Sequence, residues 1–318
     1  MSSSLEGIWT IFYVYIIGLV YGIREKFWRR QKLDDIWRPS KGKSQPVAIV
    51  TGGTSGIGLQ TTKLLLEQGF RVIVVARETG DEVEGLRRLP VGNQLDLRLV
   101  DLTSLTAVRK LSEKLLAELD KVHVLVCNAG VMLHPFALTE DGYETHMAVH
   151  VLAHALLVDR LTPLLQRARR LDHLGRVVNV TSSTLFAGRL RLEGFGKNYV
   201  NGYSAYADSK LALAVYSRLL QKHCNDSIEV VCLHPGVVPG HLYRYTVFPF
   251  KQLICGLMGR IWLRTALEAA HDVVYLCLKS QISAGCYFEN GSVVDIPNFD
   301  ERTANGLFER VQSVLSST

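Results

Sequence analysis

Short runs of apolar, β-branched residues alternate along the chain with longer segments that have helical periodicity. The runs that predict buried strands are 47–51, 72–76, 97–100, 122–127, 176–181 and 228–233. The segments with helical periodicity are 59–68, 104–119, 143–165 and 203–223. Strands that alternate with helices predict an α/β fold with a doubly wound parallel sheet.

An apolar segment without charge, residues 7–23, precedes this pattern. It is at the short end of the ~17–25 residues that span a bilayer as a helix. A cluster of basic residues follows it, namely Arg24, Lys26, Arg29, Arg30 and Lys32. We therefore expect an N-terminal hydrophobic helix that anchors the chain as a single-pass membrane protein, with the downstream part in the cytosol. A helix packed in the globular domain, or one lying in the membrane interface, is the alternative.

The order of the charges disfavours a cleaved signal peptide, which begins with positive charge and ends at a small-residue site. The polar stretch that follows the basic cluster predicts a linker. The expected division is an anchor with its basic flank at 1–32, a linker at 33–45, one domain at 46–300 and a C-terminal tail at 301–318.

Composition excludes several classes of function. The net charge of +6 and the pI near 9.0 would suit an anionic partner, but the chain carries no nucleic-acid motif, so no nucleic acid is expected. The cysteines, six in number, lie mostly within apolar runs without CxxC spacing. They predict reduced core residues and no metal site.

A glycine-rich turn follows the first predicted strand. The sequence Gly52-Gly-Thr-Ser-Gly-Ile-Gly58 stands between that strand and a helix, and a second strand comes next. Glycines in this place let the backbone approach a pyrophosphate, which the helix N-terminus attracts. The context predicts a Rossmann-type dinucleotide site.

The residue after the second strand indicates which dinucleotide binds. Arg77 stands there and suits a 2′-phosphate, so NADP(H) is preferred and NAD(H) is the second candidate. The alternative is that Arg77 is a surface residue without a role in binding.

Tyr206 and Lys210 are one helical turn apart and share a helix face. A cation beside a phenol favours the phenolate and lowers the phenol pKa, which suits proton exchange with a substrate oxygen. Ser182 and Ser183 end the strand predicted at 176–181, at the sheet edge where ligands bind. A hydroxyl there would hydrogen-bond the reacting carbonyl or alcohol, unless both serines only cap the next segment.

These motifs together resemble the short-chain dehydrogenase/reductase family. The resemblance runs over about 47–288 and includes TGGTSGIG at 51–58, CNAG at 127–130, VTSS at 180–183, YADSK at 206–210 and HPG at 234–236. It implies a pyrophosphate turn of Gly52, Ser55, Gly56, Ile57 and Gly58. The other implied cofactor contacts are Asp101 and Leu102 at the adenine, Asn128, Ala129 and Gly130 in the cleft, and Pro235 and Gly236 at the nicotinamide.

The resemblance also implies the catalytic roles. Tyr206 would be the acid/base, Lys210 would hold the nicotinamide ribose and tune Tyr206, and Ser183, rather than Ser182, would polarise the substrate. Two positions depart from the family pattern. His150 stands where the family often has an asparagine that supports a water relay, so the relay would become pH-sensitive, unless His150 is only a polar helix residue. Gly240 stands where the family has a threonine that contacts the cofactor.

The segment 242–263 is unusually apolar and lies where the family builds its substrate lid. An apolar lid suits a lipophilic substrate; contact with a bilayer and core packing are the alternatives. The stretches 264–270 and 285–288 resemble the retinol dehydrogenase-like branch, which includes polyprenol dehydrogenases.

The sequence therefore predicts an NADP(H)-dependent enzyme for a polyprenol, retinoid or steroid alcohol, in the endoplasmic reticulum membrane. The resemblance is compatible with a homodimer. The rival hypothesis is a catalytically impaired protein that binds NADP(H) as a sensor or membrane scaffold.

Overall fold

A parallel sheet forms the centre of the computed structural model, which describes residues 3–33, 36–38, 44–79, 81–88, 94–172, 174–246, 256, 259 and 262–318. The order of its strands is β3-β2-β1-β4-β5-β6-β7-β8. The strands are β1 (Val47–Thr51), β2 (Arg71–Ala76), β3 (Leu95–Leu99), β4 (Val124–Cys127), β5 (Arg176–Val180), β6 (Glu229–His234), β7 (Tyr287–Glu289) and β8 (Ser292–Val294). Among these strands, β8 alone pairs in antiparallel fashion. The order reverses between β1 and β4, which is the switch point of a doubly wound sheet.

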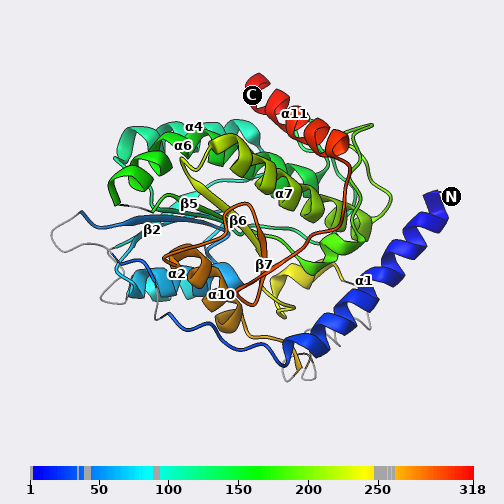
Figure 1. The fold of residues 1–318 in the computed structure, drawn as a ribbon, viewed down its shortest axis with the longest axis horizontal. Helices are drawn as coiled ribbons and strands as arrows, with labels where there is room; N and C mark the ends of the chain where they lie inside the picture. Colours follow the sequence, from blue (N-terminus) through cyan, green and yellow to red (C-terminus); the bar gives the residue numbers. More distant parts are fainter. Residues whose placement is uncertain are drawn as a thin grey trace.

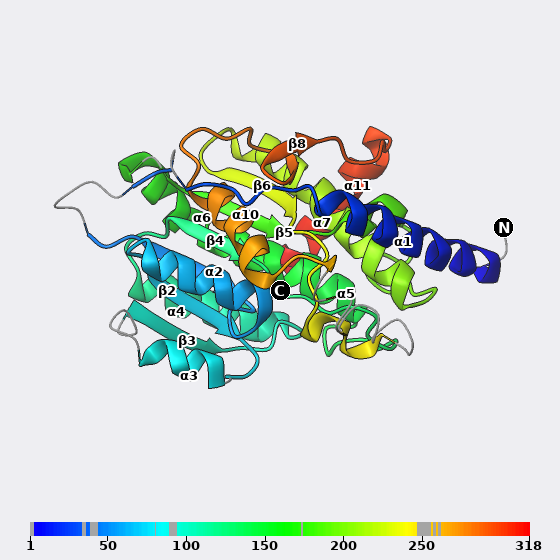
Figure 2. The ribbon, with the colours of Figure 1, turned by 90° about the horizontal axis from the view of Figure 1, so that it is seen from below.

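Helices cover both faces of the sheet. One face carries α4 (Leu105–Glu118), α6 (Ala153–Asp172), α7 (Gly202–Cys224) and α11 (Glu301–Ser317), and the other carries α2 (Gly56–Glu67) and α10 (Ala266–Leu278) (Figure 1). The short α3 (Asp81–Arg87) lies beside β3 at the sheet edge (Figure 2). The α/β fold class and the Rossmann-type sheet predicted from the sequence are confirmed.

The strand sequences are continuous apolar runs because both of their faces are buried. In β1, Val47 and Ile49 pack into the core under α4, α6 and α7, whereas Ala48 and Val50 pack into the core under α2 and α10. Alternate residues of a strand point to opposite faces, so one strand supplies both cores.

Two of the predicted segments differ in the structure. The helix expected at 143–165 is α5 (Thr145–Met147), a π-helical turn (Ala148–Leu152) and then α6. The C-terminal segment expected as a tail is the helix α11. It buries Ala304, Leu307 and Val311 against the core beside α7 because its apolar residues recur at helical spacing. Within the expected linker, Trp37 is held to the domain, since its Nε1 donates to the Asp172 carbonyl at 2.8 Å.

The N-terminal hydrophobic helix is present as α1 (Ser3–Glu25). It is long and apolar enough to cross a membrane, as is the segment Thr145–Asp172, whose residues are mostly buried in the core. Seen from below, α1 lies beside α7 and extends past the end of the sheet (Figure 2). Val14, Ile17 and Tyr21 of α1 are buried against the domain. The opposite side of α1 exposes Ile8, Trp9, Phe12, Tyr13, Ile16, Leu19, Val20 and Ile23.

Candidate active site

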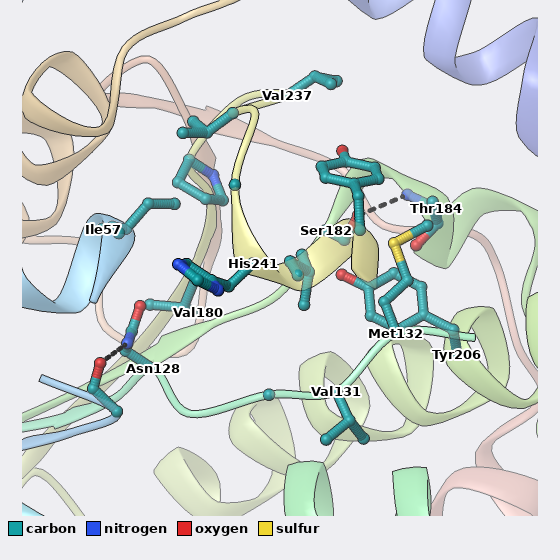
Figure 3. Close-up of a pocket in the computed structure, with 18 of the residues that line it drawn as sticks. Ile57, Asn128, Val131, Met132, Val180, Ser182, Thr184, Tyr206, Val237 and His241 are labelled. Carbon is teal, nitrogen blue, oxygen red and sulfur yellow. Dashed lines mark hydrogen bonds between the residues drawn. The ribbon is translucent and has the colours of Figure 1, made fainter. Parts of the chain in front are cut away.

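A cavity of about 760 Å³ opens at the carboxyl ends of the parallel strands. Its walls come from the glycine turn after β1 and from the segments after β2, β4, β5 and β6, together with α1 and α7. Parallel strands end at the same edge of a sheet, so segments that are far apart in the sequence meet there. In Figure 3, Ile57 and Asn128 lie on one side of the cavity, and Ser182, Met132 and Tyr206 lie on the other.

The glycine turn has the shape that a pyrophosphate requires. Gly56 has a φ of +54° and begins α2, and nothing lies within 4 Å of a Cβ placed on it, so the approach to the helix N-terminus is open. At Gly58 a Cβ would lie 2.2 Å from the Gly52 carbonyl oxygen, so only glycine fits. The side chain of Ser55 does not cap α2 and the first turn carries no acidic residue. The backbone N–H groups in the first turn of α2 are therefore suited to bind an anion.

The other residues predicted to bind the cofactor line the same cavity. Arg77 and Asp101 lie there with Leu102, and so do Asn128, Ala129, Gly130, Pro235 and Gly236. The Asn128 amide donates to the Thr51 carbonyl at 2.9 Å, which ties the loop after β4 to the end of β1. The structure thus brings together every residue predicted for the cofactor.

The residues predicted to be catalytic come from α7 and from the end of β5. Tyr206 is buried, and the Ser182 hydroxyl lies near enough to its phenol to favour the phenolate. The sequence favoured Ser183 for this position. Consecutive residues of an extended segment point in opposite directions, and Ser182 is extended, so the hydroxyl that reaches Tyr206 belongs to Ser182. Ser183 begins a 3₁₀ turn (Ser183–Ala187), where it is buried beside the cavity.

Burial sets the ionisation of the tyrosine–lysine pair. It raises the pKa of Tyr206 to about 12, and the hydrogen bond with Ser182 acts in the opposite direction. Burial lowers the pKa of Lys210 to about 7. Lys210 Nζ donates to the Val180 carbonyl at 2.9 Å and lies 5.7 Å from the centroid of the Tyr206 ring. The sequence predicted a lowered pKa for Tyr206; in the structure desolvation outweighs the effect of the lysine and the net shift is upward.

His150 lies behind these groups, in the π-helical turn before α6, and does not line the cavity. Its Nε2 accepts the Val131 N–H at 3.0 Å, so the proton of the neutral ring is on Nδ1, which is 2.8 Å from Ser209 Oγ. Burial, and then the nearby Lys210, lower the pKa of His150 well below its usual range. The pH-sensitive relay expected from the sequence therefore does not fit, because His150 stays neutral near pH 7 and both ring nitrogens already have partners.

The cavity has a wall that the sequence did not predict. Val14, Ile17 and Gly18 of α1 line it, together with residues that follow β6. At the cavity edge, the hydroxyl of Tyr15 is 2.6 Å from that of Tyr203. The expected substrate lid contributes Tyr243, Trp262 and Leu263 to the lining. Seven more of its apolar residues lie outside the described residues, namely Phe248, Phe250, Leu253, Ile254, Leu257, Met258 and Ile261.

Known proteins resemble this chain in sequence and in fold. Residues 46–245 match the short chain dehydrogenase family. The chain belongs to that family. It is an alcohol or carbonyl oxidoreductase, as the sequence predicted, and the resemblance to the retinol and polyprenol dehydrogenase branch is confirmed by its relatives.

Two relatives of this short-chain dehydrogenase match most of its length. Polyprenol dehydrogenase of Mus musculus is 37% identical over 86% of this chain and 83% of the relative. Retinol dehydrogenase 12 of Homo sapiens is 31% identical over 89% of this chain and 88% of the relative. Among solved structures, the Pseudomonas aeruginosa RhlG/NADP active-site complex has a TM-score of 0.60 and 27% identity, and the match covers 76% of this chain and 93% of that one.

The positions of the two serines generate a direct test. Ser182→Ala removes the hydroxyl that reaches Tyr206, so kcat should fall by about 100-fold, as for loss of one donor to a reacting oxygen. Ser183→Ala removes a neighbouring hydroxyl and should change kcat less than about threefold. Steady-state turnover of retinal with NADPH measures both. The reverse order of effects would restore Ser183 as the residue that contacts the substrate.

Proposed function

We propose that this chain interconverts a lipophilic alcohol and its aldehyde or ketone with NADP(H), and that Tyr206 transfers the proton. The convergence of Tyr206, Ser182 and Lys210 at one wall of the cavity, with the glycine turn at another, supports the proposal above all. The same convergence argues against a catalytically impaired sensor or scaffold, because such a protein needs none of the three groups.

The proton path follows from the hydroxyl groups of the chain. In reduction, the substrate carbonyl oxygen accepts hydrogen bonds from Tyr206 and Ser182, which polarise the carbonyl and hold it in place. The dinucleotide, when bound, supplies the hydride for reduction and accepts it in oxidation. As the carbonyl carbon gains the hydride, the Tyr206 proton passes to the oxygen, which leaves an alcohol and a phenolate. Oxidation follows these steps in reverse.

The raised pKa of Tyr206 keeps the phenol protonated near neutral pH, so it is ready to donate. After donation, the ammonium of Lys210 stabilises the phenolate. Lys210 has a pKa of about 7, so it gains or loses its own proton in the same pH range. The Val180 carbonyl holds Nζ in place while this happens. His150 acts in this scheme as a positioning residue, since it holds the Val131 N–H of the adjacent loop.

Preference for NADP(H) rests on Arg77. Its guanidinium follows β2 at the cavity and is largely exposed, and within the described part of the chain its one ion-pair partner is the exposed Glu78 at 3.5 Å. A guanidinium in that place suits the 2′-phosphate. The similar RhlG structure is an NADP complex, which supports the same choice. NAD(H) is the alternative.

The lipophilic substrate is supported by the relatives and by the lining of the cavity. The relatives are named polyprenol dehydrogenase and retinol dehydrogenase. In this chain, Val14 and Ile17 of α1, with Met132 and Leu263, give the cavity an apolar lining. An apolar cavity with a few convergent polar groups favours a hydrocarbon substrate with one polar end. Retinoid, polyprenol and steroid alcohols are the candidates.

Membrane association is proposed through the exposed face of α1. Both ends of α1 contact the domain: Glu6 pairs with Arg191 at one end, and Arg24 pairs with Glu289 at 2.9 Å at the other. A helix held at both ends cannot cross a bilayer while the domain stays on one side. The contacts therefore favour a helix lying in the interface over a single-pass span. Location in the endoplasmic reticulum, a cytosolic active site and a homodimer stay predictions.

Tyr206→Phe tests the chemistry. The variant keeps the ring and loses the proton, so turnover of retinal should fall by at least about 1,000-fold. NADPH affinity, followed by the fluorescence of the reduced nicotinamide, should stay within about twofold. Unchanged turnover would refute the proposed mechanism, whatever the affinity.

Arg77→Gln tests the cofactor preference. Loss of a charged hydrogen bond to the 2′-phosphate should raise the KM for NADPH about tenfold or more. The KM for NADH should not change, because NADH has no phosphate there, and this makes NADH the internal control. An equal effect on both cofactors would show that Arg77 does not select between them.

An N-terminal glycosylation acceptor tests the topology in microsomes. A single-pass helix with cytosolic basic residues would carry the acceptor into the lumen, where it is modified. A helix in the interface leaves the acceptor outside, so we expect no modification, although the protein still floats with the membranes. The same acceptor behind a cleavable signal peptide is the positive control. Efficient glycosylation would establish the single-pass arrangement.

A further inference from the structure

The last turn of α1 contacts the segment that is proposed to face the nicotinamide. Glu25 is buried at the end of the helix, where one oxygen is 2.9 Å from His234 Nε2 and the other accepts the Val237 N–H at 2.7 Å. The two partners stand on either side of the Pro235–Gly236 pair. One carboxylate therefore spans the whole turn 234–237 and fixes its two ends.

Aromatic rings of α1 and of the segment after it complete the contact. Tyr21 packs edge-on against the His234 ring with centroids 5.2 Å apart, and Trp28 does so at 5.9 Å. Together with Glu25, these residues surround the His234 side chain, which is 2% exposed. Helical spacing places Tyr21 and Glu25 on the same face of α1, the face that meets the end of β6.

Arg264 is a second side chain that holds the turn. Its guanidinium donates to the Pro235 carbonyl at 2.7 Å and to the Asp272 carboxylate at 2.6 Å. A Cβ on Gly236 would lie 2.5 Å from Arg264 Cδ and 2.9 Å from a Glu25 oxygen. The turn thus packs closely against both side chains, and Gly236, with a φ of +98°, leaves no room there for a larger residue.

We propose that α1 is a built-in wall of the active site and that Glu25 is a positioning residue, which holds the turn 234–237 in the geometry needed for hydride transfer. The inference rests on the proposed function, because the turn matters to turnover only if the nicotinamide lies against it. A displacement of about 1 Å at a reacting centre can cost about 100-fold in rate. Coupling is also reciprocal: if docking of α1 orders the turn for the cofactor, the cofactor must stabilise the docked helix.

A second carboxylate offers a matched control. Glu289 on β7 accepts the Tyr21 hydroxyl at 2.6 Å and pairs with Arg24 at 2.9 Å, so it too docks the end of α1. It has no hydrogen bond to the turn 234–237 among the described contacts, and it does not line the cavity. Loss of Glu289 weakens docking alone, whereas loss of Glu25 weakens docking and releases the turn.

Hydrogen exchange of the full-length protein in detergent micelles, with and without NADPH, tests the coupling without a substitution. We expect NADPH to slow exchange both in the glycine turn 52–58 and at amides 25–28. Slower exchange in the glycine turn alone would overturn the role of α1 and leave the proposed function intact. No slowing in either place would show that NADPH does not bind, and the proposed function would fail together with the inference.

Kinetics of three variants separate positioning from docking. Glu25→Ala leaves two buried donors without acceptors, so kcat for retinal should fall about tenfold or more. Glu25→Gln keeps an acceptor for the Val237 N–H, and its amide N–H can donate to His234 Nε2 when the ring carries its proton on Nδ1. It should therefore restore most of the lost kcat. Glu289→Ala should lower Tm as Glu25→Ala does, but with kcat within about twofold of the parent.

The value of kcat for Glu25→Ala decides between the two roles. A kcat equal to that of the parent would overturn the inference. If Glu25→Ala does not fold, the exchange experiment decides alone.

Discussion

The parallel alignment of β1, β4, β5 and β6 is the constraint on which the site depends. Pairing in register ends these strands at one edge, so the glycine turn, the loop after β4, Ser182 and the turn 234–237 meet there. Thr51 fixes the edge at its centre, because its hydroxyl accepts the N–H groups of Asn128 and Ala129 at 2.9 and 3.0 Å. Local bonds of this kind turn a sheet edge into a cavity of defined shape.

The reactive groups are buried, and their chemistry follows from that burial. Desolvation moves the pKa of Tyr206 upward and that of Lys210 downward, so both groups favour their neutral forms. The protein offsets part of this cost with hydrogen bonds to groups that cannot titrate, such as the Val180 carbonyl. His150 follows the same logic, since it satisfies the Val131 N–H as a neutral ring. A polar network that is complete in this way holds its members rigidly.

The N-terminal helix has two different faces. One face of α1 packs on the domain and lines the cavity, and the other presents a row of large apolar side chains. A bilayer in contact with the second face would lie one helix diameter from the substrate cavity, about 10 Å. That short path suits the proposed substrate, which dissolves in lipid.

The sequence by itself determined the order of strands and helices, the glycine turn and the tyrosine–lysine pair. These features depend on local periodicity, on backbone conformations that only glycine adopts easily, and on the spacing of one helical turn. Tertiary structure decided the rest. The choice of Ser182 over Ser183 depends on the direction in which an extended backbone points each side chain. The upward pKa shift of Tyr206 depends on how deeply the fold buries it. The partners of Glu25 are about 210 residues away along the chain, and no local pattern encodes a contact over that separation, because it forms only when the helix packs against the finished sheet.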